Sequence, residues 1–131
     1  MKLKISEFQI QSAFFDWVHL MEQKDERYYN IFAIPNGGLR NIRVAQKLKR
    51  EGTLAGVLDV FIAVQSEAFC PDNSLRLHYP GAFIEFKAGK NKMTKEQLLF
   101  AERMKKQGYY CALCYSTEAA IDFTRYYLGE K

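Results

Sequence analysis

Isolated charges inside two apolar segments constrain the fold of this chain more than any other feature. Residues 57–64 read VLDVFIAV and residues 81–88 read GAFIEFKA, and their apolar, β-branched and aromatic content is typical of buried strands. Asp59 interrupts the first segment, and Glu85 and Lys87 interrupt the second. A charged side chain buried in a sheet is costly unless it is paired or binds a metal, so these three residues require an explanation.

Helical patterns surround these segments, and two of them begin with a capping box. SEFQ places Ser6 at the N-cap and Gln9 at N3, and TKEQ does the same with Thr94 and Gln97. Hydrophobic periodicity and turn residues define the remaining elements. In chain order the sequence predicts a helix, a strand, a helix, two strands, a helix, a strand and a helix, over 6–21, 28–34, 41–50, 57–64, 81–88, 94–107, 109–115 and 116–128.

This order of elements predicts an α/β fold in which helices flank a central mixed β-sheet. The chain has 131 residues, enough to bury one core, and shows no internal repeat and no linker rich in Pro, Gly or Ser. We therefore expect one domain over residues 1–131. No apolar run approaches the roughly 20 residues that a membrane span needs. The N-terminus also lacks the pattern of a signal peptide, so we expect a cytoplasmic protein with no membrane partner.

Net charge and cysteine content indicate which ligands and cross-links to expect. The chain carries 19 Lys and Arg against 15 Asp and Glu, and a formal net charge of +4 permits a nucleic-acid partner without proving one. Its three cysteines are too few, and odd in number, for a disulfide framework. Cys111 and Cys114 have no second pair or nearby His for a zinc site, and in a strand they point to opposite faces. Reduced, buried thiols are expected.

The three charges in the strands suit the hydrolysis of a phosphodiester bond. Side chains alternate along a strand, so Glu85 and Lys87 share one face, and Asp59 on a neighbouring strand can join them. Carboxylate oxygens are hard ligands suited to Mg²⁺ or Mn²⁺, which polarise a phosphate and lower the pKa of an attacking water. Lys87 would orient that water or stabilise the transition state. The alternative is a partly exposed Glu85–Lys87 pair at a sheet edge, with an unrelated Asp59 at a strand end.

The order of several motifs resembles the VRR-NUC family of PD-(D/E)xK nucleases. That family's pattern runs from an Asn-rich turn with Gly and Arg through a basic helix to G-x-P-D, E-x-K, a Lys-rich loop and a helix with Gln. Here AIPNGGLRNIRVAQKLKREGTLAGVLDVFIA supplies the first parts, and GAFIEFKAGKNKMTKEQ supplies the E-x-K and Gln97. Leu58 stands where the family has Pro before the metal-binding Asp, and the stretch from Asp59 to Glu85 is long.

The resemblance implies a restriction-endonuclease-like version of the α/β fold and a set of roles. Carried over by position, the catalytic residues are Asp59, Glu85, Lys87, Gln97 and Glu7, and the metal ligands are Asp59, Glu85, Glu7 and the backbone carbonyl of Phe86. Gln97 would position water or substrate, although its place at N3 is equally that of a helix cap. Glu7 would complete the metal shell from the first helix, and the alternative is a partner for the helix dipole.

Basic residues on both sides of the predicted centre are candidates for DNA binding. They precede Asp59 and follow Lys87 along the chain, so they could neutralise phosphates on either side of the scissile bond. Residues 36–38 form a turn whose backbone could approach a phosphate closely, or only a strand-exit turn. The candidates are Asn36, Gly37, Gly38, Arg40, Arg43, Lys47, Lys90, Lys92 and Lys95. Solvated surfaces without a ligand are the alternative interpretation.

Taken together, the motifs and the resemblance imply a Mg²⁺- or Mn²⁺-dependent endodeoxyribonuclease. Small standalone members of the family are linked to Holliday-junction resolution as homodimers, and a two-fold enzyme can place two active sites on opposed strands. The leading hypothesis is therefore a homodimeric resolvase of four-way junctions, acting in a bacterial cell or a phage-infected host. A less selective DNA endonuclease or nickase, and a catalytically silent DNA-binding module, are the alternatives.

Overall fold

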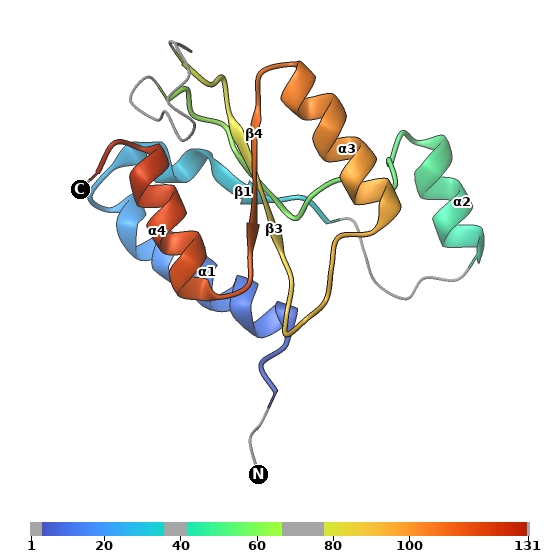
Figure 1. Ribbon diagram of the computed structural model, residues 1–131, viewed down its shortest axis with the longest axis horizontal. Helices are drawn as coiled ribbons and strands as arrows, with labels where there is room; N and C mark the ends of the chain where they lie inside the picture. The colour runs from blue at the N-terminus through green and yellow to red at the C-terminus, as the bar shows by residue number, and fades with distance from the viewer. Residues whose placement is uncertain (1–3, 36–41, 67–77, 131) are drawn as a thin grey trace.

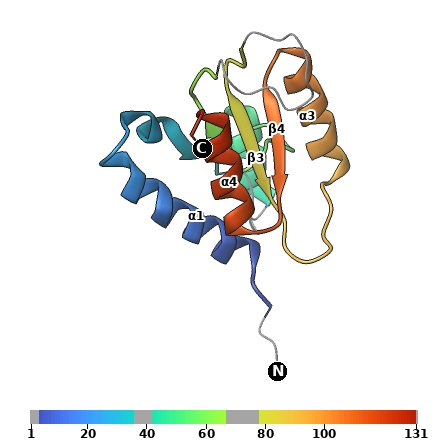
Figure 2. The ribbon, with the colours of Figure 1, turned by 60° about the vertical axis from the view of Figure 1, so that its left-hand side comes forward.

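A mixed β-sheet lies at the centre of the molecule, and helices cover both of its faces (Figure 1 and Figure 2). The computed structural model describes residues 4–35, 42–66 and 78–130. Its strands are β1 (Ile31–Ala33), β2 (Val60–Ile62), β3 (Ala82–Phe86) and β4 (Tyr110–Cys114). Within the described ranges these four strands form one sheet in the order β1-β2-β3-β4. The pairs β1–β2 and β2–β3 are antiparallel, whereas β3 and β4 are parallel.

The helices begin where the sequence predicts them. They are α1 (Glu7–Glu22), α2 (Ile42–Arg50), α3 (Lys95–Lys106) and α4 (Thr117–Tyr127), with a 3-10 helix, η1 (Glu26–Asn30), after α1. Both capping boxes are present: Ser6 Oγ accepts from the Gln9 amide over 3.1 Å, and Thr94 Oγ1 accepts from the Gln97 amide over 3.2 Å. The predicted α/β class, with a mixed sheet flanked by helices, is therefore confirmed.

The strand predicted over 28–34 is wrong at its beginning, because β1 starts only at Ile31. The residues before it form η1, which Asp25 caps by accepting from the Arg27 amide over 3.0 Å. Tyr28 is fully buried in this turn, and its hydroxyl donates to Glu130 Oε1 over 3.1 Å. Aromatic content alone is typical of a strand, so the sequence did not separate a buried aromatic turn from the strand that follows it.

The sheet separates two apolar clusters of unequal size. On the face covered by α1 and α4, Phe14 packs against Phe86, with 5.6 Å between the ring centroids. On the opposite face, α3 places Phe100 at 5.2 Å from Phe83. Because side chains alternate along β3, Glu85 points to the same face as Phe83, toward α3.

The register of β2 and β3 brings Asp59 to this same face. Val60, the first residue of β2, is paired with Ile84. Asp59, directly before β2, reaches the end of β3, where its Oδ2 accepts from the Phe86 amide over 2.8 Å. The next pair on this face, Phe61 and Phe83, has ring centroids 4.6 Å apart. The Asp59 carboxylate thus lies beside β3, the strand that carries Glu85. The strand predicted over 57–64 is shorter than expected, because β2 begins only after Asp59 and covers Val60–Ile62.

A close backbone approach places the start of α3 beside this part of the sheet. Gly56, three residues before Asp59, has a φ of 86°, and a Cβ there would lie 2.5 Å from the Glu96 backbone. Glycine alone fits both the left-handed conformation and the contact. The turn before Asp59 therefore rests directly on the first turn of α3, which carries Gln97.

α2 lies at the side of the molecule in the view of Figure 1, and none of its residues is buried. Its last turn carries Lys47, Lys49 and Arg50. In the part of the chain that the structure describes, no helix is long and apolar enough to span a membrane.

Candidate active site

Glu85 is the most deeply buried charged residue of the candidate site. Only 2% of its surface is exposed, on β3 beneath the start of α3. Its Oε2 accepts a hydrogen bond from Gln97 Nε2 over 2.8 Å and lies 3.4 Å from Lys87 Nζ. Its Oε1 is buried and has no hydrogen-bond partner among the described residues. A carboxylate oxygen left in this way costs free energy unless another group, such as a cation, occupies its lone pairs.

Asp59 is held by backbone groups on both sides of it. Its Oδ2 accepts a hydrogen bond from the Phe86 amide over 2.8 Å, and its carbonyl accepts from the Ile34 amide over 2.8 Å. The first bond ties the carboxylate to the strand that carries Glu85, and the second fixes the backbone against the segment after β1. The Asp59 side chain is therefore oriented without any contribution from a ligand.

Burial raises the affinity of both carboxylates for protons, and the charge of Asp59 adds to this effect at Glu85. Burial, reinforced by the charge of Asp59 and opposed by Lys87, raises the pKa of Glu85 from 4.5 to about 7. Burial also raises the pKa of Asp59, against the lowering effect of the Phe86 amide. Two acidic groups in one poorly solvated place resist double ionisation, and a cation between them would favour the charged forms.

Gln97 holds Glu85 and caps α3 at the same time. Its Nε2 donates to Glu85, while its Oε1 accepts from the Thr94 amide over 2.9 Å. The two interpretations offered by the sequence, a helix cap and a site residue, are therefore compatible in one conformation. The opposite ends of the amide group serve the two contacts.

Lys87 lies between Glu85 and Glu7. Its Nζ is 4.0 Å from Glu7 Oε1, in the first turn of α1, and its side chain is 12% exposed. Glu85 and Lys87 share one face of β3, as alternation requires. Glu7 is more open, with 43% of its side chain exposed. The structure thus brings Glu7, Asp59, Glu85, Lys87 and Gln97 together through a chain of contacts.

The donors at this place suit a hard divalent cation. Asp59 and Glu85 offer carboxylate oxygens, and the unpartnered Glu85 Oε1 is the atom whose burial such an ion would explain. Among the described residues, no group of three or more His, Cys, Asp or Glu side chains has the arrangement of a complete metal site. Further ligands would have to come from a backbone carbonyl, from water or from substrate, as is usual for Mg²⁺.

The residues predicted to bind DNA fall into three groups. Asn36, Gly37, Gly38 and Arg40 lie outside the described residues. Arg43 and Lys47 are exposed on α2, where Lys47 Nζ lies 3.9 Å from Glu51 Oε1. Lys90, Lys92 and Lys95 are exposed along the connection from β3 to α3 and at the first residue of that helix. The last group directly follows Lys87 in the chain.

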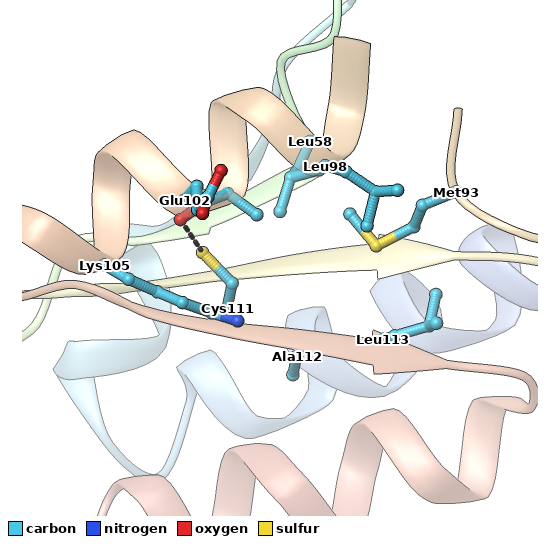
Figure 3. Close-up of a pocket in the computed structure, with 9 residues that line it drawn as sticks. Leu58, Met93, Leu98, Glu102, Lys105, Cys111, Ala112 and Leu113 are labelled. Carbon is cyan, nitrogen blue, oxygen red and sulfur yellow. Dashed lines mark hydrogen bonds between the residues drawn. The ribbon is translucent and has the colours of Figure 1, made fainter. Parts of the chain in front are cut away.

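Cys111 and Cys114 are not part of the site. They are free thiols on opposite faces of β4, as the sequence predicts, and burial raises the pKa of both to about 11. Cys111 lines an apolar cavity of about 290 Å³ between α3 and β4 (Figure 3), where its Sγ donates to the Ala101 carbonyl over 3.9 Å. Protonated, buried thiols are poor metal ligands and poor nucleophiles.

Comparison with known proteins supports the architecture. No protein-family model matches this sequence, and no curated protein matches it either. Among solved structures, a chain described as "VRR_NUC domain protein" is similar, with a TM-score of 0.74. The match has 24% sequence identity and covers 97% of this chain and 91% of the other. The two chains share a fold over nearly their whole lengths, and the predicted fold is therefore confirmed.

Proposed function

We propose that this chain is a VRR-NUC-type, PD-(D/E)xK nuclease that hydrolyses phosphodiester bonds in DNA with a divalent metal ion. The observation that carries the proposal is the meeting of Asp59, Glu85 and Lys87 on one face of the sheet. One buried carboxylate oxygen of Glu85 lacks a partner there among the described residues. The motif order in the sequence and the fold shared with a chain described as a VRR_NUC domain protein support the same assignment.

The residues of the site divide the work of the reaction. Asp59 and Glu85, with the Phe86 carbonyl, would hold Mg²⁺ or Mn²⁺, and Glu7 would add a carboxylate from α1. When bound, the metal neutralises phosphate charge and makes a coordinated water a better nucleophile. Lys87 places a positive charge beside Glu85 to orient the water or to stabilise the transition state. Gln97 keeps Glu85 in place by hydrogen bonding.

Basic groups around the site would hold the DNA backbone. The exposed Lys90, Lys92 and Lys95 follow directly on the β3 strand, so phosphates next to the scissile bond would lie near them. The exposed Arg43 and Lys47 on α2, together with Arg40 and the turn at 36–38, would extend this surface. Such contacts are independent of sequence and weaken with salt.

We further propose that the substrate is branched DNA and that the enzyme acts as a homodimer, cutting four-way junctions. Exposed apolar side chains on α3 and β4, Leu98, Leu99 and Leu113, offer material for an interface between copies. A two-fold dimer would present two such sites to opposed strands. The less selective endonuclease or nickase and the silent binding module are distinguished from it by the experiment below.

The test compares cleavage of a labelled four-way junction and a matched linear duplex in the presence of Mn²⁺ or Mg²⁺. Glu85→Ala removes the buried carboxylate, and Asp122→Ala, at an exposed position of α4, is the matched control. Paired symmetric cuts on the junction by wild type and Asp122→Ala, lost in Glu85→Ala and in EDTA, are expected. Equal cutting of both DNAs would contradict the resolvase hypothesis and support a less selective endonuclease. Binding of DNA without any cutting would support a catalytically silent DNA-binding module.

A further inference from the structure

A groove opens where three segments meet at the ends of β3 and β4. It is formed by the start of α1, the connection from β3 to α3 and the connection from β4 to α4. These segments lie together at the lower end of the sheet in Figure 1, and Figure 2 shows the same meeting from another side. The volume of the groove is about 790 Å³, within the range of sites that hold small organic ligands.

We infer that this groove binds an unpaired nucleotide of the DNA substrate beside the scissile bond, an inference that rests on the proposed nuclease function. The groove adjoins the candidate site by chain connectivity and by contact. Its residues 88–91 directly follow Lys87, and Lys87 pairs with Glu7 in the turn of α1 that follows Lys4 and Ile5. A strand that leaves the metal site along the end of β3 would enter the groove.

The lining suits the face of a base better than a phosphate. Ile5, Ile10, Ala88 and the ring of Tyr115 contribute apolar surface, and Tyr115 is 43% exposed. The Tyr115 hydroxyl donates to the Asn91 carbonyl over 2.8 Å, so the ring is held in place before a ligand arrives. Aromatic rings are the usual stacking partners of unpaired bases, because every base has a π-face.

Charge in the groove favours a nucleic acid as the occupant. Lys4 and Lys90 line it, and Glu118 is the opposing charge, in the first turn of α4, where the helix dipole counteracts it. Two ammonium groups beside an apolar ring match a nucleotide, which joins a phosphate to a flat base. In paired duplex the base faces are covered by stacking, so the groove selects unpaired DNA, such as the strands at a branch point.

The test is a double-mutant cycle on binding, measured by fluorescence anisotropy in EDTA so that no DNA is cut. The DNA is a labelled duplex with an unpaired thymidine tail, or the same duplex with an abasic tail that keeps the phosphates. The protein is wild type or Tyr115→Leu, with Tyr115→Phe, which keeps the ring, as the second variant. Stacking on one base predicts that Tyr115→Leu weakens binding of the thymidine tail about tenfold.

The expected result is coupling between the ring and the bases. Tyr115→Leu should weaken binding of the abasic tail far less than of the thymidine tail. Tyr115→Phe keeps the ring and loses only the bond to Asn91, so it should bind the thymidine tail much more tightly than Tyr115→Leu. Equal losses with both tails, or no preference of wild type for the thymidine tail over the abasic tail, would overturn the inference. Coupling without any metal-dependent cleavage would refute the nuclease proposal alone, and cleavage without coupling would refute the groove alone.

Discussion

Gln97 Nε2 donates a hydrogen bond to Glu85 Oε2 over 2.8 Å, across the space between α3 and β3. The other end of the same amide accepts from the Thr94 backbone over 2.9 Å. The position of the buried carboxylate is thus tied to the N-terminus of a helix. Thr94 and Gln97 both cap α3, but only Gln97 contacts the Glu85 carboxylate. Substitutions of the two residues can therefore separate an effect on stability from an effect on catalysis.

Gln97→Ala and Thr94→Ala should therefore have different effects. Loss of the Thr94 cap should lower the free energy of unfolding by about 1 kcal/mol and leave the cleavage rate near that of wild type. Loss of Gln97 should lower the cleavage rate about tenfold or more, because a hydrogen bond to a charged group is worth about 1.5–3 kcal/mol. Single-turnover cleavage and urea unfolding measure the two effects. Equal activity losses in the two variants would reduce Gln97 to a cap.

Substitutions of Asp59 should separate its structural bond from its role as a ligand. Asp59→Asn keeps an oxygen to accept from the Phe86 amide, whereas Asp59→Ala leaves that amide without its partner. Both variants should lose metal-dependent cleavage. Only Asp59→Ala should also lose stability, by about 1–3 kcal/mol, the cost of an unsatisfied buried donor. Urea unfolding in EDTA provides the measurement, and an Asn variant that still cleaves would remove Asp59 from the metal site.

Local patterns in the sequence are sufficient to predict where helices begin and that Glu85 and Lys87 point to the same side of their strand. Capping boxes at Ser6 and Thr94 involve residues three apart, so they are visible without any tertiary structure. The shared face of Glu85 and Lys87 follows from strand alternation in the same way. The juxtaposition of Asp59 and Glu85 depends on the register of two segments far apart in sequence. Strand alternation allowed it and the family resemblance favoured it, but neither determines that register.

The packing of α3 against the turn at Gly56 could not be predicted. Gly56 belongs to the GVLD motif, and its positive φ and contact with the Glu96 backbone give it a positioning role that the sequence analysis did not assign. A Gly three residues before the motif Asp59 was the available signal, but a glycine alone does not reveal what approaches it. The pairing of Glu7 with Lys87 also depends on how α1 crosses the sheet end.

The stability of the metal-free protein should fall as pH rises through the titration of Glu85. In the unfolded chain its pKa is near 4.5, and in the folded protein burial raises that pKa to about 7. Between these values the folded state holds a proton that the unfolded state has released, so stability is fully present below the lower pKa and is lost by the upper one.

Glu85→Gln provides the reference for this effect, because it removes the titrating group and retains the shape. Relative to wild type in EDTA, its free energy of unfolding should increase from about pH 5 to about pH 8, since only wild type loses stability over that window. Urea unfolding at the two pH values measures the difference. A difference that does not change with pH would mean that Glu85 titrates normally.

Metal binding should distinguish the ligands of the site from its lysine. Ligand bound only by the native state stabilises it, so Mn²⁺ should raise the Tm of wild type, and more at about pH 8 than at about pH 6 because the carboxylates must be ionised. Glu85→Ala should abolish both the rise in Tm and cleavage.

Lys87→Met removes a cation that lies 3.4 Å from Glu85 Oε2, so this variant should keep the rise in Tm while cleavage falls by about a hundredfold or more. Thermal unfolding with and without Mn²⁺, paired with cleavage rates, measures both. If Lys87→Met instead lost the metal response together with cleavage, the lysine would act by positioning Glu85, and the catalytic charge would have to come from another residue.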